Sequence, residues 1–183
     1  MEIKEELKKM LTPARYEHSL RVAEEAKHLA NRYQYDEKKA YLAGLIHDIA
    51  KDLTEEESET WIKNYNLPKE LLEEKNKNLK HADIGAVIAK EKYHLEDDIC
   101  NAIKFHTLGN ENMDLLAKIV FLADKIGRKN LPEDLEIVKK MAYQNIDQSL
   151  KLCLEKQEKY LQQKGIKLHK DTKKLLAKLT KEL

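Results

Sequence analysis

The sequence predicts an all-α protein folded as one domain, and three observations support this prediction. Only five glycines and three prolines occur among 183 residues, so the chain has few residues for tight turns between short strands. Apolar residues recur at helical spacing along most segments, and no segment shows the alternating pattern of a half-buried strand. The length is sufficient for a single hydrophobic core that needs no disulfide.

Two helices are expected in the first fifty residues. The Thr-Pro pair at residues 12–13 is typical of a helix start, because proline is favoured at the first helical position, and this helix should extend to about Tyr33. Asp36 can cap a second helix over residues 37–50. Residues 40–46 are apolar on nearly every side, which predicts that the second helix is buried.

Shorter helices are expected in the middle of the chain. Thr54 and Glu57 have the spacing of a capping box and should start an acidic helix. Pro68 should open a short helix, residues 76–78 are expected to form a loop, and residues 81–93 should form the next helix.

Two further helices are expected before the C-terminal region. Asp97 or Asp98 should start a helix that ends at Phe105. Asp114 should cap a helix over residues 115–126, which is apolar on nearly every side and is therefore the second helix expected in the core.

The C-terminal region is expected to form amphipathic helices. Pro132 should begin them, Gly165 should interrupt them, and residues 171–172 should cap a last Lys-rich helix. Several apolar residues here are expected to be exposed and could support a homodimer: Leu150, Leu152, Leu154 and Tyr160.

Charge and composition restrict the class of protein. The chain has 34 Lys and Arg against 33 Asp and Glu, which argues against nucleic-acid binding through a broad basic surface. No apolar run is long enough to span a membrane, and the N-terminus lacks the apolar segment of a signal peptide, so we expect a cytoplasmic protein. Cys100 and Cys153 lack zinc-site spacing and are expected to be reduced.

Polar residues with metal-binding side chains interrupt the two most apolar helices. His47 and Asp48 end the first, and Asp124 lies within the second. A buried carboxylate without a partner is costly, so each aspartate implies a nearby partner. A divalent metal ion suits a histidine and two aspartates together. For Asp124, an ion pair with Lys125 is the simpler alternative.

Three more histidines are candidate ligands. His18 lies on the first long helix, three residues after Arg15, while His81 and His106 lie at the ends of predicted helices. A lone histidine at a helix end more often makes a hydrogen bond than binds a metal, so each is weak support when considered alone. Their spacing adds little, because residues on separate helices have no required interval.

The combination resembles a known family. The order His18, His47-Asp48, His81, His106, Asp124 is similar to the H…HD…D signature of HD-domain metal-dependent phosphohydrolases. The segments ARYEHSLRVAEEA, LAGLIHDIAKDLT, HADIGAVIA, AIKFHTLG, KIVFLADKI and KGIKLHKDT resemble the YqeK family of symmetrical diadenosine tetraphosphate hydrolases. The resemblance extends from about Ala14 to Leu179. HTLG and residues 127–130 depart from the family pattern.

The resemblance implies an HD-type helical bundle with a dinuclear metal centre. Residues 1–183 would form one HD domain, with a catalytic core over about 14–126 and C-terminal helices over 132–183 that complete the nucleotide pocket. Iron is the implied metal and manganese the alternative, since a histidine-rich set with two carboxylates suits either better than magnesium. The implied ligands are His18, His47, Asp48, His81, His106 and Asp124, with Asp48 shared by two ions.

The resemblance also implies a substrate and the residues that act on it. The substrate would be diadenosine tetraphosphate, which water activated by two metal ions would cleave into two ADP. The implied catalytic residues are Asp48, Lys51, His81 and His106. The implied phosphate-side contacts are Arg15, Lys51, His81, His106, Thr107, Asp124, Arg128 and Asn130. The implied contacts at the nucleoside end are Ile166, Lys167, Leu168, His169, Lys170 and Asp171.

Other functions fit the same sequence. A different HD phosphohydrolase, acting on deoxynucleoside monophosphates or on guanosine tetra- and pentaphosphates, would share the ligand set. A helical module that binds nucleotides without catalysis is a second alternative. Nucleic-acid binding through the Lys-rich C-terminal helices is a third, and it predicts a steep dependence of binding on salt.

Overall fold

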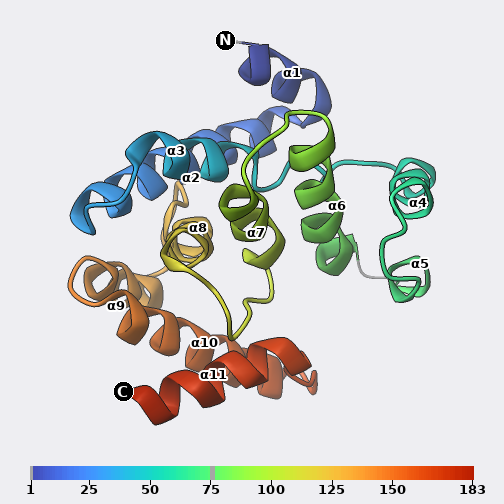
Figure 1. Ribbon diagram of the computed structural model, residues 1–183. Coiled ribbons are helices and arrows are strands. Elements are labelled where there is room, and N and C mark those ends of the chain that lie inside the picture. Colours follow the sequence, from blue (N-terminus) through green and yellow to red (C-terminus); the bar gives the residue numbers. More distant parts are fainter. Residues whose placement is uncertain (1, 75–76) are drawn as a thin grey trace.

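The computed structural model describes residues 2–74 and 77–183, and within these ranges it contains helices and no strand (Figure 1). The all-α prediction is therefore confirmed. The helices are α1 (Glu2–Met10), α2 (Pro13–Arg32), α3 (Glu37–Ile46), α4 (Glu55–Asn64), α5 (Glu70–Glu73), α6 (Lys77–Glu91), α7 (Asp97–Phe105), α8 (Leu115–Ile126), α9 (Glu133–Ala142), α10 (Ile146–Gln163) and α11 (Lys170–Glu182).

Helix α8 forms the centre of the core. Asp114 caps it as expected, because its Oδ1 accepts a hydrogen bond of 2.8 Å from Ala117 N. Most of the helix is buried, as its apolar sequence predicts. Helices α2, α3 and α7 pack on one part of its surface, and α9 and α10 pack on another (Figure 1). Side chains on α8 are therefore close to most other parts of the fold.

Helices α2 and α3 pack closely because Gly44 has no side chain. A β-carbon at Gly44 would lie 3.0 Å from both Ala23 Cα and Val22 O. Helix α3 ends at Ile46, four residues earlier than expected. The chain turns there, since Ile49 N bonds Ile46 O and Lys51 N bonds Asp48 O instead of continuing the α-helical pattern. This turn places the His-Asp pair at the edge of the helix.

Two predicted boundaries before α7 were wrong. Lys77 and Asn78 belong to α6 rather than to a loop, and Asn76 lies outside the described residues. No glycine or proline stands between Lys77 and His81 to delay the helix start, so His81 lies within α6 instead of opening it.

The capping box predicted at the start of α4 is confirmed, with Thr54 and Glu57 bonding each other's backbone.

The C-terminal region differs from the prediction in its caps and its exposure. Asn145 caps α10 and separates it from α9, a break that no glycine or proline in the sequence predicts. His169, not residues 171–172, caps α11, because its Nδ1 accepts a hydrogen bond from Asp171 N. Leu150 and Leu154, expected at the surface, are fully buried. They belong to the face of α10 that packs on α8 and α9, while Tyr160 is exposed.

The cysteines and the apolar character of the helices can also be compared with the sequence. Cys100 and Cys153 are both free thiols in buried positions. Among the described residues, no helix combines the length and the apolar character that crossing a membrane requires.

Candidate metal centre and phosphate pocket

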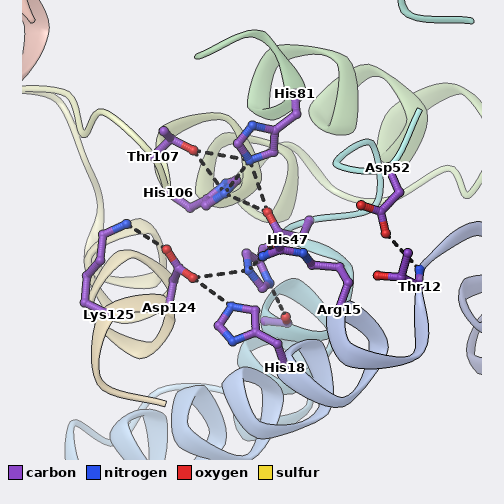
Figure 2. Close-up of polar contacts among 12 residues, drawn as sticks. Thr12, Arg15, His18, His47, Asp52, His81, His106, Thr107, Asp124 and Lys125 are labelled. Atoms are coloured by element: carbon purple, nitrogen blue, oxygen red, sulfur yellow. Dashed lines mark hydrogen bonds and ion pairs between the residues drawn. The ribbon is translucent and has the colours of Figure 1, made fainter. Parts of the chain in front are cut away.

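The structure brings together all six predicted metal ligands (Figure 2). They come from separate elements: one from α2, two from the turn after α3, one from α6, one from the residue after α7 and one from α8. Four of the six are buried: His47, Asp48, His81 and His106. In chain order the six are His18, His47, Asp48, His81, His106 and Asp124.

His47 is oriented by its own helix. Its Nδ1 donates a hydrogen bond of 2.7 Å to the carbonyl oxygen of Gly44, so the other ring nitrogen, Nε2, is the one available to bind a metal ion. That Nε2 atom is buried and has no hydrogen-bond partner among the described residues. It lies 3.4 Å from Asp48 Oδ2 and 3.5 Å from Asp124 Oδ1. One ring nitrogen and two carboxylate oxygens therefore face one another, and a proton or a bound cation must lie among them.

His106 is oriented in the same way. Its Nδ1 donates to the carbonyl oxygen of Ile103 at 2.6 Å, which leaves a lone pair on Nε2. This Nε2 lies 3.0 Å from His81 Nε2, and both face Asp48 Oδ1, at 3.5 Å and 3.1 Å respectively. The hydroxyl of Thr107 lies 3.1 Å from His106 Nε2. This side of the site again gathers several hydrogen-bond acceptors.

Asp124 contacts a histidine of the site with one carboxylate oxygen and a lysine with the other. Its Oδ1 lies 2.9 Å from His18 Nε2, and its Oδ2 accepts a hydrogen bond of 2.7 Å from Lys125 Nζ. The ion pair with Lys125, considered from the sequence as the alternative to metal binding, is present. It uses only one carboxylate oxygen and leaves the other facing the histidines.

The donor set fits divalent metal ions. Potential ligand atoms of His18, His47 and Asp124 lie within 4.8 Å of one another, and so do those of His47, Asp48 and His106. Imidazole and carboxylate ligands suit iron, manganese and zinc, and the described ligand groups contain no thiolate. The buried, unpartnered Nε2 of His47 belongs to both groups, which is the arrangement expected where a cation completes the hydrogen-bonding needs of the site.

The pKa shifts reflect the same need for positive charge. Burial raises the pKa of Asp48, but the nearby imidazoles of His47, His106 and His81 outweigh it and hold that pKa well below its usual range. Burial lowers the pKa of His47, yet the carboxylates of Asp48 and Asp124 raise it to about 10. Burial lowers the pKa of His106 to about 4. Burial raises the pKa of Asp124, but Lys125, His18 and His47 outweigh it and hold that pKa well below its usual range. Both carboxylates thus stay ionised, and a proton on His47 or a bound cation compensates their charge.

A hollow of about 550 Å³ opens directly over these ligands. Arg15 lies at one side, where its guanidinium donates a hydrogen bond of 2.8 Å to Asp48 Oδ2. Lys51 lies beside it, and burial lowers the pKa of its ammonium group. The lining residues other than lysine and arginine are His18, Asp48, His106, Thr107 and Asp124. The cationic lining residues are Arg15, Arg21, Lys51, Lys125, Arg128 and Lys129.

Several predicted contact residues do not line this hollow. Asn130 is exposed, beyond the lining residues of the same loop. His81 is buried and is not among the lining residues. None of residues 166–171 lines the hollow, and one of them, His169, serves as the cap of α11. A larger hollow of about 730 Å³ lies between α2 and α3, and the six ligands do not line it.

Three cations of the hollow were not predicted as contacts: Arg21, Lys125 and Lys129. A sequence signal existed for the first, because Arg21 follows His18 at the same three-residue interval by which Arg15 precedes it. The only sequence signal for Lys125 is its position next to Asp124. The only signal for Lys129 is its position next to Arg128.

Comparison with known proteins gives one family and several close relatives. The HD domain family model matches residues 15–129. The chain is 34% identical over 167 residues to a protein of Bacillus subtilis named symmetrical bis(5'-nucleosyl)-tetraphosphatase, covering 91% of this chain and 89% of that one. A Staphylococcus aureus protein of the same name is 32% identical over 168 residues, covering 90% and 86%.

A solved structure is also similar over the whole chain. It is a Clostridium acetobutylicum protein described as a predicted HD superfamily hydrolase involved in NAD metabolism. The two chains superpose with a TM-score of 0.91 at 33% identity, covering 100% of this chain and 97% of the other.

Proposed function

Because the chain belongs to the HD domain family, we propose that it is a metal-dependent symmetrical bis(5'-nucleosyl)-tetraphosphatase. It hydrolyses diadenosine tetraphosphate to two molecules of ADP. The relatives from Bacillus subtilis and Staphylococcus aureus, which match over most of their length, carry the name of this activity. The substrate class of this chain is inferred from them.

One observation of the structure carries the proposal most strongly. Four imidazoles and two carboxylates converge beneath a hollow whose rim supplies six cationic side chains. The ligand cluster supports activation of water at a metal centre, and the cationic rim supports binding of a highly anionic polyphosphate. Binding a neutral substrate does not require six cationic side chains around the hollow.

Divalent ions bound by the six ligands would supply Lewis acidity, which activates water and neutralises charge on phosphoryl oxygens. The chain itself keeps the ligands oriented. The carbonyls of Gly44 and Ile103 accept hydrogen bonds from Nδ1 of His47 and His106, which leaves Nε2 of each ring as the nitrogen that would bind a metal ion. Lys125 holds one oxygen of Asp124 and thereby aims the other at the histidines.

The reaction joins one water oxygen to a central phosphorus and breaks the bond from that phosphorus to the central bridging oxygen. Each half of the substrate then leaves as ADP. Arg15, Lys51 and Thr107 line the hollow and would donate hydrogen bonds to phosphate oxygens, which stabilises the charge that develops during cleavage. Arg128 would contribute in the same way from the loop after α8.

The C-terminal helices would complete the nucleotide pocket. We propose that residues 1–183 act as a single HD domain, in which the segment 166–171 contacts a nucleoside end beyond the hollow. Thr172 ties this region to the site, because its hydroxyl donates a hydrogen bond of 2.7 Å to Leu108 O, two residues after His106. This contact supports the proposal that the start of α11 lies near the catalytic ligands.

Iron is the metal that we propose, with manganese as the alternative. The donor set of four imidazoles and two carboxylates supports both metals over magnesium, which prefers oxygen ligands. Elemental analysis of protein purified anaerobically distinguishes them.

The function is tested by product analysis. Metal-loaded protein is incubated with diadenosine tetraphosphate, deoxynucleoside monophosphates and guanosine tetraphosphate, and the products are separated by chromatography. We expect ADP as the only product of the dinucleotide and little turnover of the others. ATP with AMP, or no turnover, would contradict the proposal. Turnover that continues in Asp48→Ala but not in boiled protein would contradict the assigned site, with exposed Asp97→Ala as the matched control.

A further inference from the structure

Of the cations that line the hollow, Arg21 and Lys129 have no assigned role in the reaction, and Arg128 has only a general role in phosphate binding. We propose that Arg21, Arg128 and Lys129 form a second phosphate-binding group that holds the half of the dinucleotide lying away from Arg15 and Lys51. This inference rests on the proposed function and adds to it a basis for selecting long polyphosphate chains. The two groups of cations would lie on either side of the bond that breaks.

Helix α2 sets the spacing between the two groups. Arg15, His18 and Arg21 follow one another at three-residue intervals, and all three line the hollow. With a rise of about 1.5 Å per residue, the two arginines are separated by roughly 9 Å along the helix axis, and the histidine lies midway. A polyphosphate whose centre lies at His18 therefore meets one arginine on each side.

Gly127 brings the other two cations to Arg21. A β-carbon at Gly127 would lie 2.7 Å from Ala123 O and 3.3 Å from Val22 Cα. Glycine thus allows the loop after α8 to lie directly against the backbone of α2, next to Arg21. Arg128 and Lys129 follow at once in this loop, and both are exposed at the edge of the hollow.

These three cations have weaker acidic partners than Arg15 and Lys125, which also line the hollow. Arg15 and Lys125 lie 2.8 Å and 2.7 Å from carboxylate oxygens. The nearest acidic group to Arg21 is Glu17, at 3.8 Å, and the buried Nε of Arg21 has no hydrogen-bond partner among the described residues. Within residues 2–74 and 77–183, neither cation of the loop makes an ion pair.

Uncompensated positive charge at the edge of a metal-binding pocket favours an anionic ligand. The ligands Asp48 and Asp124 already interact with Arg15 and Lys125, so these cations are partly neutralised. Arg21, with the two loop cations, adds charge that a monophosphate would not reach if it were held near the metal ligands. A tetraphosphate extends on both sides of its central bond and would engage both groups. Selection for a long polyphosphate follows from this arrangement.

The proposal is tested with the full-length, metal-loaded protein and the variants Arg21→Gln, Arg128→Gln and Lys129→Gln. Loss of a charge-assisted hydrogen bond should raise KM for diadenosine tetraphosphate about tenfold or more for Arg21→Gln, while kcat stays within about twofold. Arg21→Lys should recover most of the lost affinity because it retains the charge. The matched control is Lys140→Gln, which removes one exposed charge from α9, away from the hollow.

A binding measurement separates this inference from the proposed function. Inorganic tripolyphosphate is titrated into each metal-loaded variant by calorimetry, which needs no turnover. Weaker binding in the glutamine variants, with wild-type binding in Lys140→Gln, supports the second group even if wild-type protein fails to hydrolyse the dinucleotide. Equal tripolyphosphate affinity and equal KM in all variants would overturn it. An Arg21→Lys variant as impaired as Arg21→Gln would overturn it too, since charge would then not matter.

Discussion

The Nε2 atoms of His81 and His106 lie 3.0 Å apart, and both face Oδ1 of Asp48. The Nε2 of His106 carries a lone pair, because its Nδ1 donates to Ile103 O. An imidazole lone pair and a carboxylate oxygen are both acceptors, so their close approach requires a proton or a cation between them. A divalent ion meets this requirement for the whole cluster, whereas one proton serves a single pair.

Metal binding should therefore stabilise the fold. A ligand present at one hundred times its Kd contributes about 2.7 kcal/mol, which for a chain of this size raises Tm by roughly 5–10 °C. We expect this rise when Mn²⁺ or Fe²⁺ is added to metal-depleted protein, as measured by thermal unfolding. The rise should be much smaller in His81→Ala and unchanged in His28→Ala, which removes an exposed histidine of α2. An identical Tm with and without metal would contradict the metal centre.

Gly44 should be essential to both packing and site geometry. Its absent side chain lets α3 approach α2, and its carbonyl oxygen accepts the hydrogen bond from His47 Nδ1. Gly44→Ala should destabilise the protein by about 1–3 kcal/mol, because the added methyl group meets backbone atoms of α2. Denaturant unfolding measures this change. The comparison is Ala40→Gly in the same helix, which should cost only about 1 kcal/mol plus the loss of a buried methyl group.

Lys125 should act through Asp124 rather than on the substrate. Its ammonium group binds Asp124 Oδ2, and this ion pair, opposed by burial, raises the pKa of Lys125. Lys125→Met should lower metal affinity by about 10- to 100-fold, the range typical for residues that orient metal ligands. Competition with a chelator measures the affinity. Lys118→Met, which breaks an ion pair with Asp147 elsewhere on α8, should leave metal affinity unchanged.

Asp98 should contribute pH-dependent stability away from the site. Burial opposes its ionisation, but Lys39, the backbone N–H of Ile99 and Tyr35 outweigh that effect and lower its pKa. A carboxyl group with a lowered folded-state pKa stabilises the fold above its unfolded pKa of about 3.9, and this contribution is lost as pH falls through the folded pKa.

The matching experiment compares Asp98→Asn with Asp97→Asn. At pH 7 the first should cost about 1 kcal/mol, while the second, an exposed aspartate paired with Lys90, should cost less than about 0.5 kcal/mol. Unfolding free energies from pH 7 down to about pH 3 should show the Asp98→Asn deficit shrinking. A deficit that is constant with pH would show that the ionised carboxylate is not its source.

Local signals in the sequence predicted most helices but not all of their ends. Asp114 and the capping box at Thr54 start helices where expected, because side-chain caps act within one turn. The end of α3 was placed too late because nothing in the sequence of His47 to Ala50 excludes a helix. The turn there depends on tertiary contacts, such as the hydrogen bond from Thr12 N to Asp52.

The sequence predicted the candidate metal ligands but not all of the cations that line the hollow. Six candidate ligands were predicted because histidines and aspartates stand out beside apolar helices and match a family pattern, and the structure brings these side chains together. Arg21 was missed because charged residues are common on the outer face of a long helix. Only the approach of the loop at Gly127 shows that it shares a hollow with Arg128. Burial of Leu150 and Leu154 was likewise set by packing between distant helices.

The most direct test of the account measures metal content and turnover on the same preparation. Metal-free protein is titrated with Fe²⁺ under anaerobic conditions, and bound iron per chain is measured together with ADP formed from diadenosine tetraphosphate. We expect activity to rise with bound iron to a plateau near two ions per chain, and we expect Asp48→Ala to lose both iron binding and activity. Full ADP production by metal-free protein, or wild-type activity in Asp48→Ala, would contradict it.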